Sequence, residues 1–275
     1  MERLVSFGID NLLRNSIKIY LLLFFALNTS AQNLLFNGSF EEYIKQPESV
    51  QYSFYNRKLY YSKGWDACCS NKNDSCGSTD YYYYPNYYES KSWKQPKQPF
   101  EGNYLIGLFA YSFRPKDFLN PGPFYREYAS GLLSTPLVVG KKYKLSLAHT
   151  NGQFFGEQKA FAHNGFGVLL STYYPMQKDD FSRLNIIPQF RTPYLLSDSI
   201  WKIMQFEFVA DSAYRYITMG NFYLSSDIEM IVYKNIGESY LFIDDVKIEP
   251  ITDKPKLPNP FTLCKPDSVF IENKE

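Results

Sequence analysis

The sequence predicts an all-β domain, a jelly-roll β-sandwich. Polar and apolar residues alternate with a period of two in several segments, and no long stripe of apolar residues has helical spacing. Glycine and proline separate these segments, as turns separate the strands of a sandwich. Aromatic residues make up 19% of the chain, with 25 Tyr and 23 Phe. Both residue types favour strands.

The chain opens with an expected signal peptide, residues 1–31. Arg14 and Lys18 supply positive charge ahead of the apolar run Ile19–Leu27, which is shorter than the ~20 residues of a spanning helix. Thr29-Ser30-Ala31 is a small-residue cleavage site, so we expect the mature chain to begin at Gln32. The alternative is an uncleaved N-terminal anchor. We expect a secreted or cell-envelope protein (periplasm or outer-membrane surface) with no transmembrane span after signal cleavage.

One domain, residues 32–250, is expected to follow, with a Pro-rich tail or linker over residues 251–275. The whole chain has 29 Lys and Arg against 28 Asp and Glu, a formal net charge of +1. This balance gives no reason to expect nucleic acid as a partner.

Five segments are predicted strands. Tyr143, Leu145 and Leu147 alternate with polar residues in the first, and Met204, Phe206 and Phe208 do so in the second. The other three cover residues 215–219, 229–233 and 239–248. Residues 125–133 could form a short helix. Residues 66–99, rich in Tyr, Ser, Asn, Lys and Pro, are predicted to be a long loop insertion.

Four cysteines, Cys68, Cys69, Cys76 and Cys264, have spacings that do not match those of a zinc site. In an exported chain they are better read as disulfide candidates. Cys76 would close a short loop with Cys68 or Cys69, and the remaining partner could tie Cys264 to this loop. Three pairings stay open.

A set of strings that occur in order resembles the N-terminal jelly-roll domain of surface proteins from Bacteroidetes-type bacteria, which is often fused to an OmpA-like domain. The strings are residues 33–42, 64–65, 79–81, 102–107, 126–128, 137–143, 201, 217–222 and 240–248, in this order. The first and last are also similar to those of galactose-binding-like carbohydrate modules. The resemblance implies a galactose-binding-like jelly roll whose opening segment pairs with its closing strand. It also implies an envelope role, beside a domain that can grip peptidoglycan.

In similar carbohydrate modules these two end segments hold a calcium ion, so structural calcium is the expected cofactor. Calcium takes six to eight oxygen ligands. Glu41, Ser39, Asp244 and Asp245 are the candidate ligands. Strand parity puts Asp244 and Asp245 on opposite faces unless a bulge intervenes, with Asp244 on the face of Phe242, Val246 and Ile248. The alternative is that Asp244 caps nearby backbone N–H groups while Glu41 lies on the surface.

Aromatic side chains around the Tyr-rich insertion are candidates for a sugar-binding face, because the C–H faces of sugars pack on Trp and Tyr rings. The candidates are Trp93, Tyr81, Tyr82, Asp80 and Trp65. Trp93 is the best of these, since Trp65 beside Gly64 is expected in the core. Trp201 also reads as a core residue.

No catalytic residue is assigned. Neither of the two histidines, His149 and His163, lies in a nucleophile motif, and the chain has no Gly-x-Ser-x-Gly or His-Glu-x-x-His sequence. We therefore expect a non-catalytic binding or adhesion module whose partner is polysaccharide or cell-wall material. The alternative is a structural or protein-interaction domain of an OmpA-type outer-membrane assembly that binds another envelope protein and no glycan. A glycan-active enzyme ranks third.

Overall fold

The computed structural model of the chain describes residues 32–47, 58–68, 79–86, 98–112, 125–154, 158–159, 162–179, 182–197, 199–231 and 238–251. The strands are β1 (Trp65–Asp66), β2 (Asp80–Tyr83), β3 (Tyr104–Ser112), β4 (Tyr128–Leu132), β5 (Lys142–Asn151), β6 (Gln153–Phe154), β7 (Gln158–Lys159), β8 (Ala162–His163), β9 (Phe166–Ser171), β10 (Phe190–Arg191), β11 (Lys202–Val209), β12 (Tyr216–Asn221), β13 (Met230–Ile231) and β14 (Glu238–Pro250). Three 3-10 turns complete the set: η1 (Leu59–Tyr61), η2 (Tyr84–Asn86) and η3 (Ser225–Asp227). Within these ranges no helix is long and apolar enough to cross a membrane.

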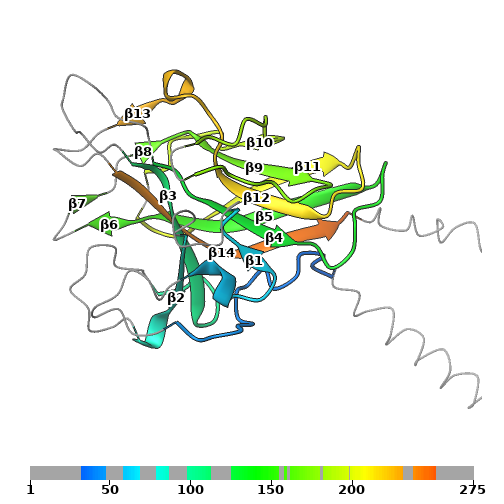
Figure 1. Cartoon of the computed structure of the whole chain (residues 1–275), viewed down its shortest axis with the longest axis horizontal. Helices are drawn as coiled ribbons and strands as arrows, with labels where there is room; N and C mark the ends of the chain where they lie inside the picture. Colours follow the sequence, from blue (N-terminus) through cyan, green and yellow to red (C-terminus); the bar gives the residue numbers. More distant parts are fainter. Residues whose placement is uncertain are drawn as a thin grey trace, which may run out of the picture.

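Two five-stranded antiparallel sheets form a sandwich, which confirms the predicted jelly-roll class (Figure 1). The β12 sheet has the order β1-β4-β12-β9-β10, and the β14 sheet has the order β11-β5-β14-β3-β2. Two small ribbons, β13-β8 and β6-β7, lie outside them. Neighbours in both sheets come from distant parts of the sequence, because the chain alternates between the two layers.

The core lies between the sheets and is built from alternate residues of the strands. Predicted strand residues Tyr143, Leu145 and Leu147 of β5 are all buried, and each is paired with Phe208, Phe206 or Met204 of β11. From the β12 sheet come Trp65, Ala129, Phe166, Val168, Leu170, Ile217 and Met219. The predicted alternation in these strands is therefore confirmed, and the polar residues between them face outward.

The opening segment is bonded to the closing strand, as the resemblance implies. Leu34 N–H donates to the carbonyl of Ile248 at 2.8 Å, and Val246 N–H donates to the carbonyl of Gly38 at 2.9 Å. Asn33 Nδ2 donates to the Val246 carbonyl, and its Oδ1 accepts from Ile248 N–H. A Cβ placed on Gly38 would lie 1.9 Å from the Val246 carbonyl oxygen, so only glycine permits this approach.

A β-bulge interrupts β14 and changes its parity. The register with β5 shifts between Asp244 and Lys247, and Asp245 has a φ of 48°. Phe242 and Asp244 consequently face outward with Ala148 and Thr150, whereas Val246 joins the core cluster beyond the bulge. The prediction that Asp244 shares a face with Val246 and Ile248 is thus wrong, because the extra residue of a bulge reverses the alternation.

Residues 128–132 form strand β4, where the sequence allowed a short helix over 125–133. The position of β4 explains the difference, because β4 pairs with β1 on one side and β12 on the other. The ring of Trp65 lies over Gly131 so closely that a Cβ there would be 2.8 Å from it. Glycine at 131 is therefore explained by the neighbouring tryptophan.

The Tyr-rich tract is also more regular than predicted. Residues 80–83, expected in a loop, form β2 at the edge of the β14 sheet, paired with residues 104–107 of β3. Tyr81 faces the core and Tyr82 the opposite side, as strand alternation requires.

Candidate functional site

Three residues of the Tyr-rich insertion that are predicted to bind sugar, Asp80, Tyr81 and Tyr82, are buried. Tyr81 is inaccessible, stacks on Tyr104 at 5.3 Å and donates its hydroxyl to the Phe40 carbonyl. Tyr82 packs in an aromatic cluster on the outer side of the β14 sheet, and its hydroxyl donates to Asp80. This corrects the expectation of an open platform at these positions, because neither ring offers a free face to a ligand.

The three tryptophans differ in their surroundings. Trp65 is a core residue as expected, with its indole N–H donating to the Asn37 carbonyl at 2.8 Å. Trp201, directly before β11, is half-buried and packs against the aromatic cluster on the outer side of the β14 sheet, so it does not lie in the core between the sheets as expected. Trp93 lies outside the described residues, and its binding role stays a prediction.

The acids expected to bind calcium accept backbone N–H groups of the loop that precedes β3. Glu41 Oε1 accepts from the N–H groups of Asn103 and Tyr104, both at 2.9 Å. Asp244 Oδ2 accepts from Glu101 N–H at 3.0 Å, and Oδ1 accepts from Asp245 N–H at 2.7 Å. Burial nonetheless raises the pKa of Asp244 to about 7, against the effect of these donors.

The remaining candidate ligands lie close by. Asp245 forms an ion pair with Lys247 at 2.7 Å, and Ser39 lies half-buried in the turn before Phe40. In the described part of the chain, no group of three or more His, Cys, Asp or Glu side chains is arranged to hold a metal ion. The arrangement therefore fits backbone capping, which is the alternative stated above. Calcium at Ser39, Glu41, Asp244 and Asp245 stays a prediction from the sequence.

Of the four disulfide candidates, the structure describes one. Cys68 is a free, fully buried cysteine, and burial raises the pKa of its thiol to about 12. This corrects its inclusion among the paired cysteines. Cys69, Cys76 and Cys264 lie outside the described residues, so a disulfide among them stays a prediction.

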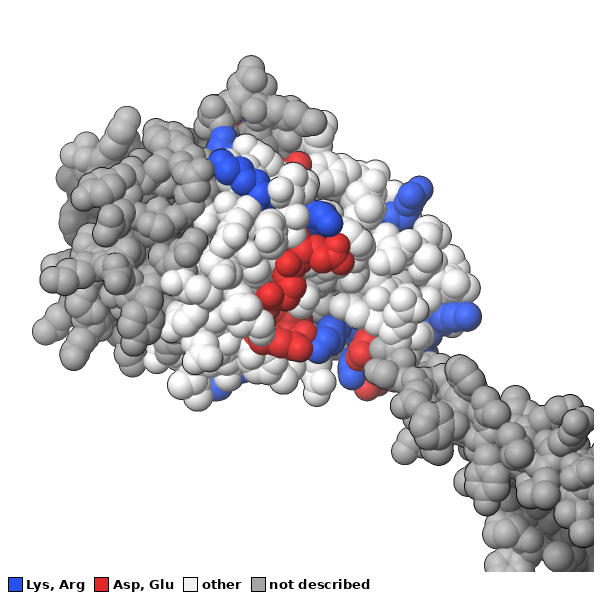
Figure 2. Space-filling model, turned by 90° about the horizontal axis from the view of Figure 1, so that it is seen from below, with Lys and Arg blue, Asp and Glu red and all other residues white. Residues whose placement is uncertain are grey.

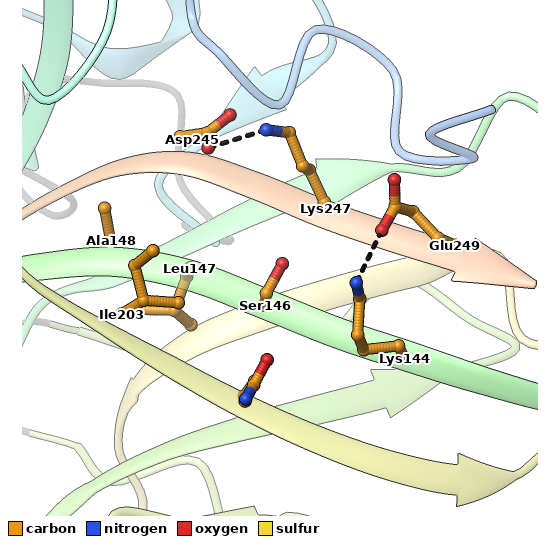
Figure 3. A pocket seen from close by; sticks show the side chains of 9 residues that line it. Lys144, Ser146, Leu147, Ala148, Ile203, Asp245, Lys247 and Glu249 are labelled. Atoms are coloured by element: carbon orange, nitrogen blue, oxygen red, sulfur yellow. Dashed lines mark hydrogen bonds and ion pairs between the residues drawn. The ribbon is translucent and has the colours of Figure 1, made fainter. Parts of the chain in front are cut away.

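A groove of about 230 Å³ crosses the outer face of the β14 sheet (Figure 3). We call it the β5–β14 groove; its residues are Lys144, Ser146, Leu147, Ala148, Ile203, Gln205, Asp245, Lys247 and Glu249. The hollow follows from side-chain size. Small residues, Ser146 and Ala148, point outward from β5, whereas longer ones rise from β11 and β14 on either side.

Hydrogen-bonding groups line this groove in a row across three strands. Gln205 of β11 and Lys247 of β14 are both direct cross-strand partners of Ser146. Within the described structure, the amide of Gln205 and the hydroxyl of Ser146 have no hydrogen-bond partner. An amide supplies both donors and acceptors, and a hydroxyl supplies one donor and two acceptor positions. Two neutral, unengaged polar groups therefore lie side by side, Ser146 on the floor and Gln205 on the β11 wall.

Two ion pairs line the groove, one within β14 and one between β14 and β5. Lys247 Nζ lies 2.7 Å from Asp245, and Lys144 Nζ of β5 lies 3.1 Å from Glu249 of β14 (Figure 3). Each pair joins two long side chains beside the small residues of the floor. Surface pairs of this kind contribute little stability, about 0–1 kcal/mol, so their main effect is on the shape and charge of the groove.

An aromatic pair lies on the same outer face as the groove, although neither ring lines it. Trp201 directly precedes β11, and alternation puts it on the side of Ile203, whose side chain is 58% exposed. Phe100, 40% exposed, meets the Trp201 ring edge-on at 6.1 Å, and the Trp201 indole N–H donates to the Gln98 carbonyl. Part of the Trp201 ring packs against the buried aromatic cluster on this face, and part of it stays open to solvent.

Acidic side chains gather into a strip on one face of the molecule, with several Lys and Arg beside it (Figure 2). Near the groove, Lys247 interacts with Asp245, Glu101 and Glu249. The groove lining itself carries two lysines, Lys144 and Lys247, and two acids, Asp245 and Glu249, so its charge is balanced and favours neither an anionic nor a cationic ligand.

Sequence reasoning missed the groove because its residues have no motif. Alternation in β5 and β11 does predict that Ser146 and Gln205 face outward. It cannot predict that β5 lies between β11 and β14, which makes the small residues a floor.

No protein-family model matches the sequence, and no curated protein matches it. Solved structures of similar fold include the CBM22-1 xylan-binding domain of Xyn10C from Paenibacillus barcinonensis, at 12% identity and a TM-score of 0.35, covering 76% of this chain and 99% of that chain. TmCBM61 in complex with β-1,4-galactotriose is similar at 13% identity and a TM-score of 0.36, covering 80% of this chain and 100% of that chain. The K1 cleaved adhesin domain of Lys-gingipain from Porphyromonas gingivalis W83 is similar at 12% identity and a TM-score of 0.36, covering 73% and 97%.

Proposed function

We propose that the chain is a non-catalytic glycan-binding module of the cell exterior or envelope, which holds a neutral polysaccharide in the β5–β14 groove. The observation that carries the proposal is the unengaged pair Gln205 and Ser146, which lie side by side in an open groove. A glycan presents many hydroxyl groups, each of which donates and accepts hydrogen bonds.

Aromatic surface near the groove supports the same ligand class. Sugar rings carry apolar C–H faces as well as hydroxyls, so they need ring surface beside polar groups. Trp201 and Phe100 offer partly exposed rings on the same outer face, and Ile203 supplies exposed apolar area along the β11 wall. A module of this kind binds and orients; none of its groove residues is assigned a catalytic role.

The test measures retention of the mature protein, residues 32–275, on xylan, β-1,4-galactan, cellulose, chitin and peptidoglycan. We expect retention on at least one of them. Gln205→Ala and Trp201→Ala should each weaken it about twofold to tenfold, since hydrogen bonds and aromatic contacts contribute about 0.5–1.5 kcal/mol each. Tyr173→Ala is the matched control, because Tyr173 is 58% exposed and lines neither this groove nor the second one described below.

Absence of retention on every polysaccharide would favour the alternative, an interaction domain of an envelope assembly. Release of reducing sugar from any of them would instead show catalysis. If Trp93→Ala abolishes retention while the Gln205 and Trp201 variants do not, the binding surface is the Tyr-rich insertion predicted from the sequence.

A further inference from the structure

A second groove, of about 260 Å³, lies on the outer face of the other sheet, at its β1 edge. We call it the β1-edge groove; the lining residues that matter here are Ile44, Tyr60, Asp66, Leu132, Tyr174 and Tyr216. Both grooves lie below the roughly 300–1,000 Å³ typical of pockets for drug-sized ligands, so each has room for only a short part of a longer ligand.

The groove arises where the sheet edge is short. β1 has only two residues, so Leu132 at the end of β4 extends past it and is exposed. Its cross-strand partner, Tyr216 of β12, lies on the same outer face. The N-terminal segment 32–47 adds Ile44, which is 71% exposed, and η1 adds Tyr60, which is 47% exposed. Apolar side chains from four parts of the chain thus remain open to solvent around one hollow.

Two of the tyrosine rings are held in place by the fold. The Tyr174 hydroxyl accepts a hydrogen bond from Cys68 N–H at 3.2 Å, which fixes its far end. Its ring meets that of Tyr216 edge-on, with centroids 5.6 Å apart and planes at 81°. Rings fixed before a ligand arrives lose little rotational freedom when it binds, so they favour binding.

Polar groups without partners accompany the rings. Asp66 Oδ1 accepts from Ala67 N–H at 2.7 Å, whereas its Oδ2 has no hydrogen-bond partner in the described part of the chain. The Tyr216 hydroxyl likewise has no hydrogen-bond partner among the described residues. The groove thus combines tyrosine faces, one available carboxylate oxygen and one available hydroxyl, which are the groups that recognise a sugar ring with its hydroxyls.

We infer that the β1-edge groove is a second carbohydrate site, which holds a single neutral sugar residue on tyrosine rings with a sugar hydroxyl donating to Asp66 Oδ2. The inference rests on the proposed function, since both assign glycans as ligands. The two sites have no residue in common and lie on opposite outer faces of the sandwich. Each can therefore be removed without touching the other.

The test is calorimetric titration of the mature protein with xylohexaose, cellohexaose, β-1,4-galactotriose and chitohexaose. For an oligosaccharide that binds, we expect two sites per chain. Tyr60→Ala and Asp66→Asn should remove one site or weaken it about tenfold, and Gln205→Ala should affect only the other. Tyr173→Ala again serves as the exposed-tyrosine control, and circular dichroism of each variant checks that the fold is intact.

The outcomes separate the two proposals. One site per chain that is lost in Gln205→Ala and unchanged in Tyr60→Ala and Asp66→Asn overturns the second site and leaves the proposed function standing. One site that is lost in the Tyr60 and Asp66 variants and unchanged in Gln205→Ala supports the β1-edge groove and overturns the assignment of the β5–β14 groove. Absence of binding to all four oligosaccharides overturns both.

Discussion

At the scale of single residues, His163 is a pH-sensitive group that lies outside the two grooves. Its side chain is fully buried, and Nδ1 accepts the N–H of Gly165 at 3.0 Å, so the neutral ring carries its proton on Nε2. Burial lowers the pKa of His163 to about 3. The ring is therefore part of the fold, in agreement with the absence of a catalytic motif around it.

The depressed pKa predicts a loss of stability in acid. The unfolded chain, with a histidine pKa of about 6.5, takes up this proton first as the pH falls. The contribution of His163 is thus fully present above about pH 6.5 and is lost progressively toward pH 3. We expect it to remove roughly 3 kcal/mol between pH 7 and pH 4, as an upper bound.

Urea unfolding at several pH values compares the parent with His163→Asn, whose side-chain oxygen can still accept from Gly165 N–H. Carboxylates contribute a slope to both proteins, so the difference between the two curves reports on the histidine alone. Parallel curves between pH 7 and pH 4 would contradict the buried neutral state.

At the scale of elements, the junction between the opening segment and β14 depends on close backbone contact. Gly38→Ala would place a methyl group 1.9 Å from the Val246 carbonyl oxygen, at the bulge that sets the parity of β14. Backbone on both sides must then move, and we expect a loss of at least about 2–3 kcal/mol in the free energy of unfolding. Urea denaturation at pH 7 measures it.

Gly140→Ala is the matched control for that substitution. Gly140 has a φ of 82° and no atom within 4 Å of an added Cβ, so it tests backbone strain without a clash. It should cost about 1–2 kcal/mol, the usual penalty for a left-handed residue. A Gly38 variant no less stable than the Gly140 variant would mean that the opening segment does not hold the sandwich closed.

The elements also show what the sequence can and cannot predict. Strands with strict alternation, such as β5 and β11, are predictable because burial of one face imposes a period of two. β4 and β2 are not predictable in this way, because partners far away in sequence determine which residues fit there. Trp65 packs over Gly131 of β4, and β3 pairs with the strand that carries Tyr81. The bulge at Asp245 has the same cause: it depends on the contact with Gly38, which no local pattern encodes.

The two proposed binding sites, the β5–β14 groove and the β1-edge groove, are also predictable from the sequence only in part. The sequence identifies outward residues such as Gln205 but not the neighbours that turn them into a groove. It also favours Tyr81 and Tyr82 for their residue type, although an edge strand buries both. Composition predicts that tyrosine will be plentiful, whereas topology decides which tyrosines, such as Tyr60 and Tyr216, remain open to a ligand.

At the scale of the whole molecule, two sugar sites on opposite outer faces predict cross-linking of polysaccharide. The sheets of a sandwich lie ~10 Å apart, and the core between them is filled, so a short oligosaccharide cannot pass from one site to the other. Each chain would instead hold two separate polysaccharide strands. Because a long polymer offers many copies of its repeat, such bivalent contacts should build a network.

Light scattering measures this network directly, with the soluble form of the polysaccharide that retains the protein most strongly. Scattering by the parent should rise to a maximum as protein is added. It should fall again in excess protein, when each polysaccharide repeat is bound by its own protein molecule and few proteins bridge two strands. Tyr60→Ala and Gln205→Ala should each still bind but produce no such rise, because either substitution leaves one site per chain. The parent without polysaccharide controls for self-association. Equal scattering by the parent and both variants would mean that cross-linking, if any, comes from association of the protein and not from two sites on one chain.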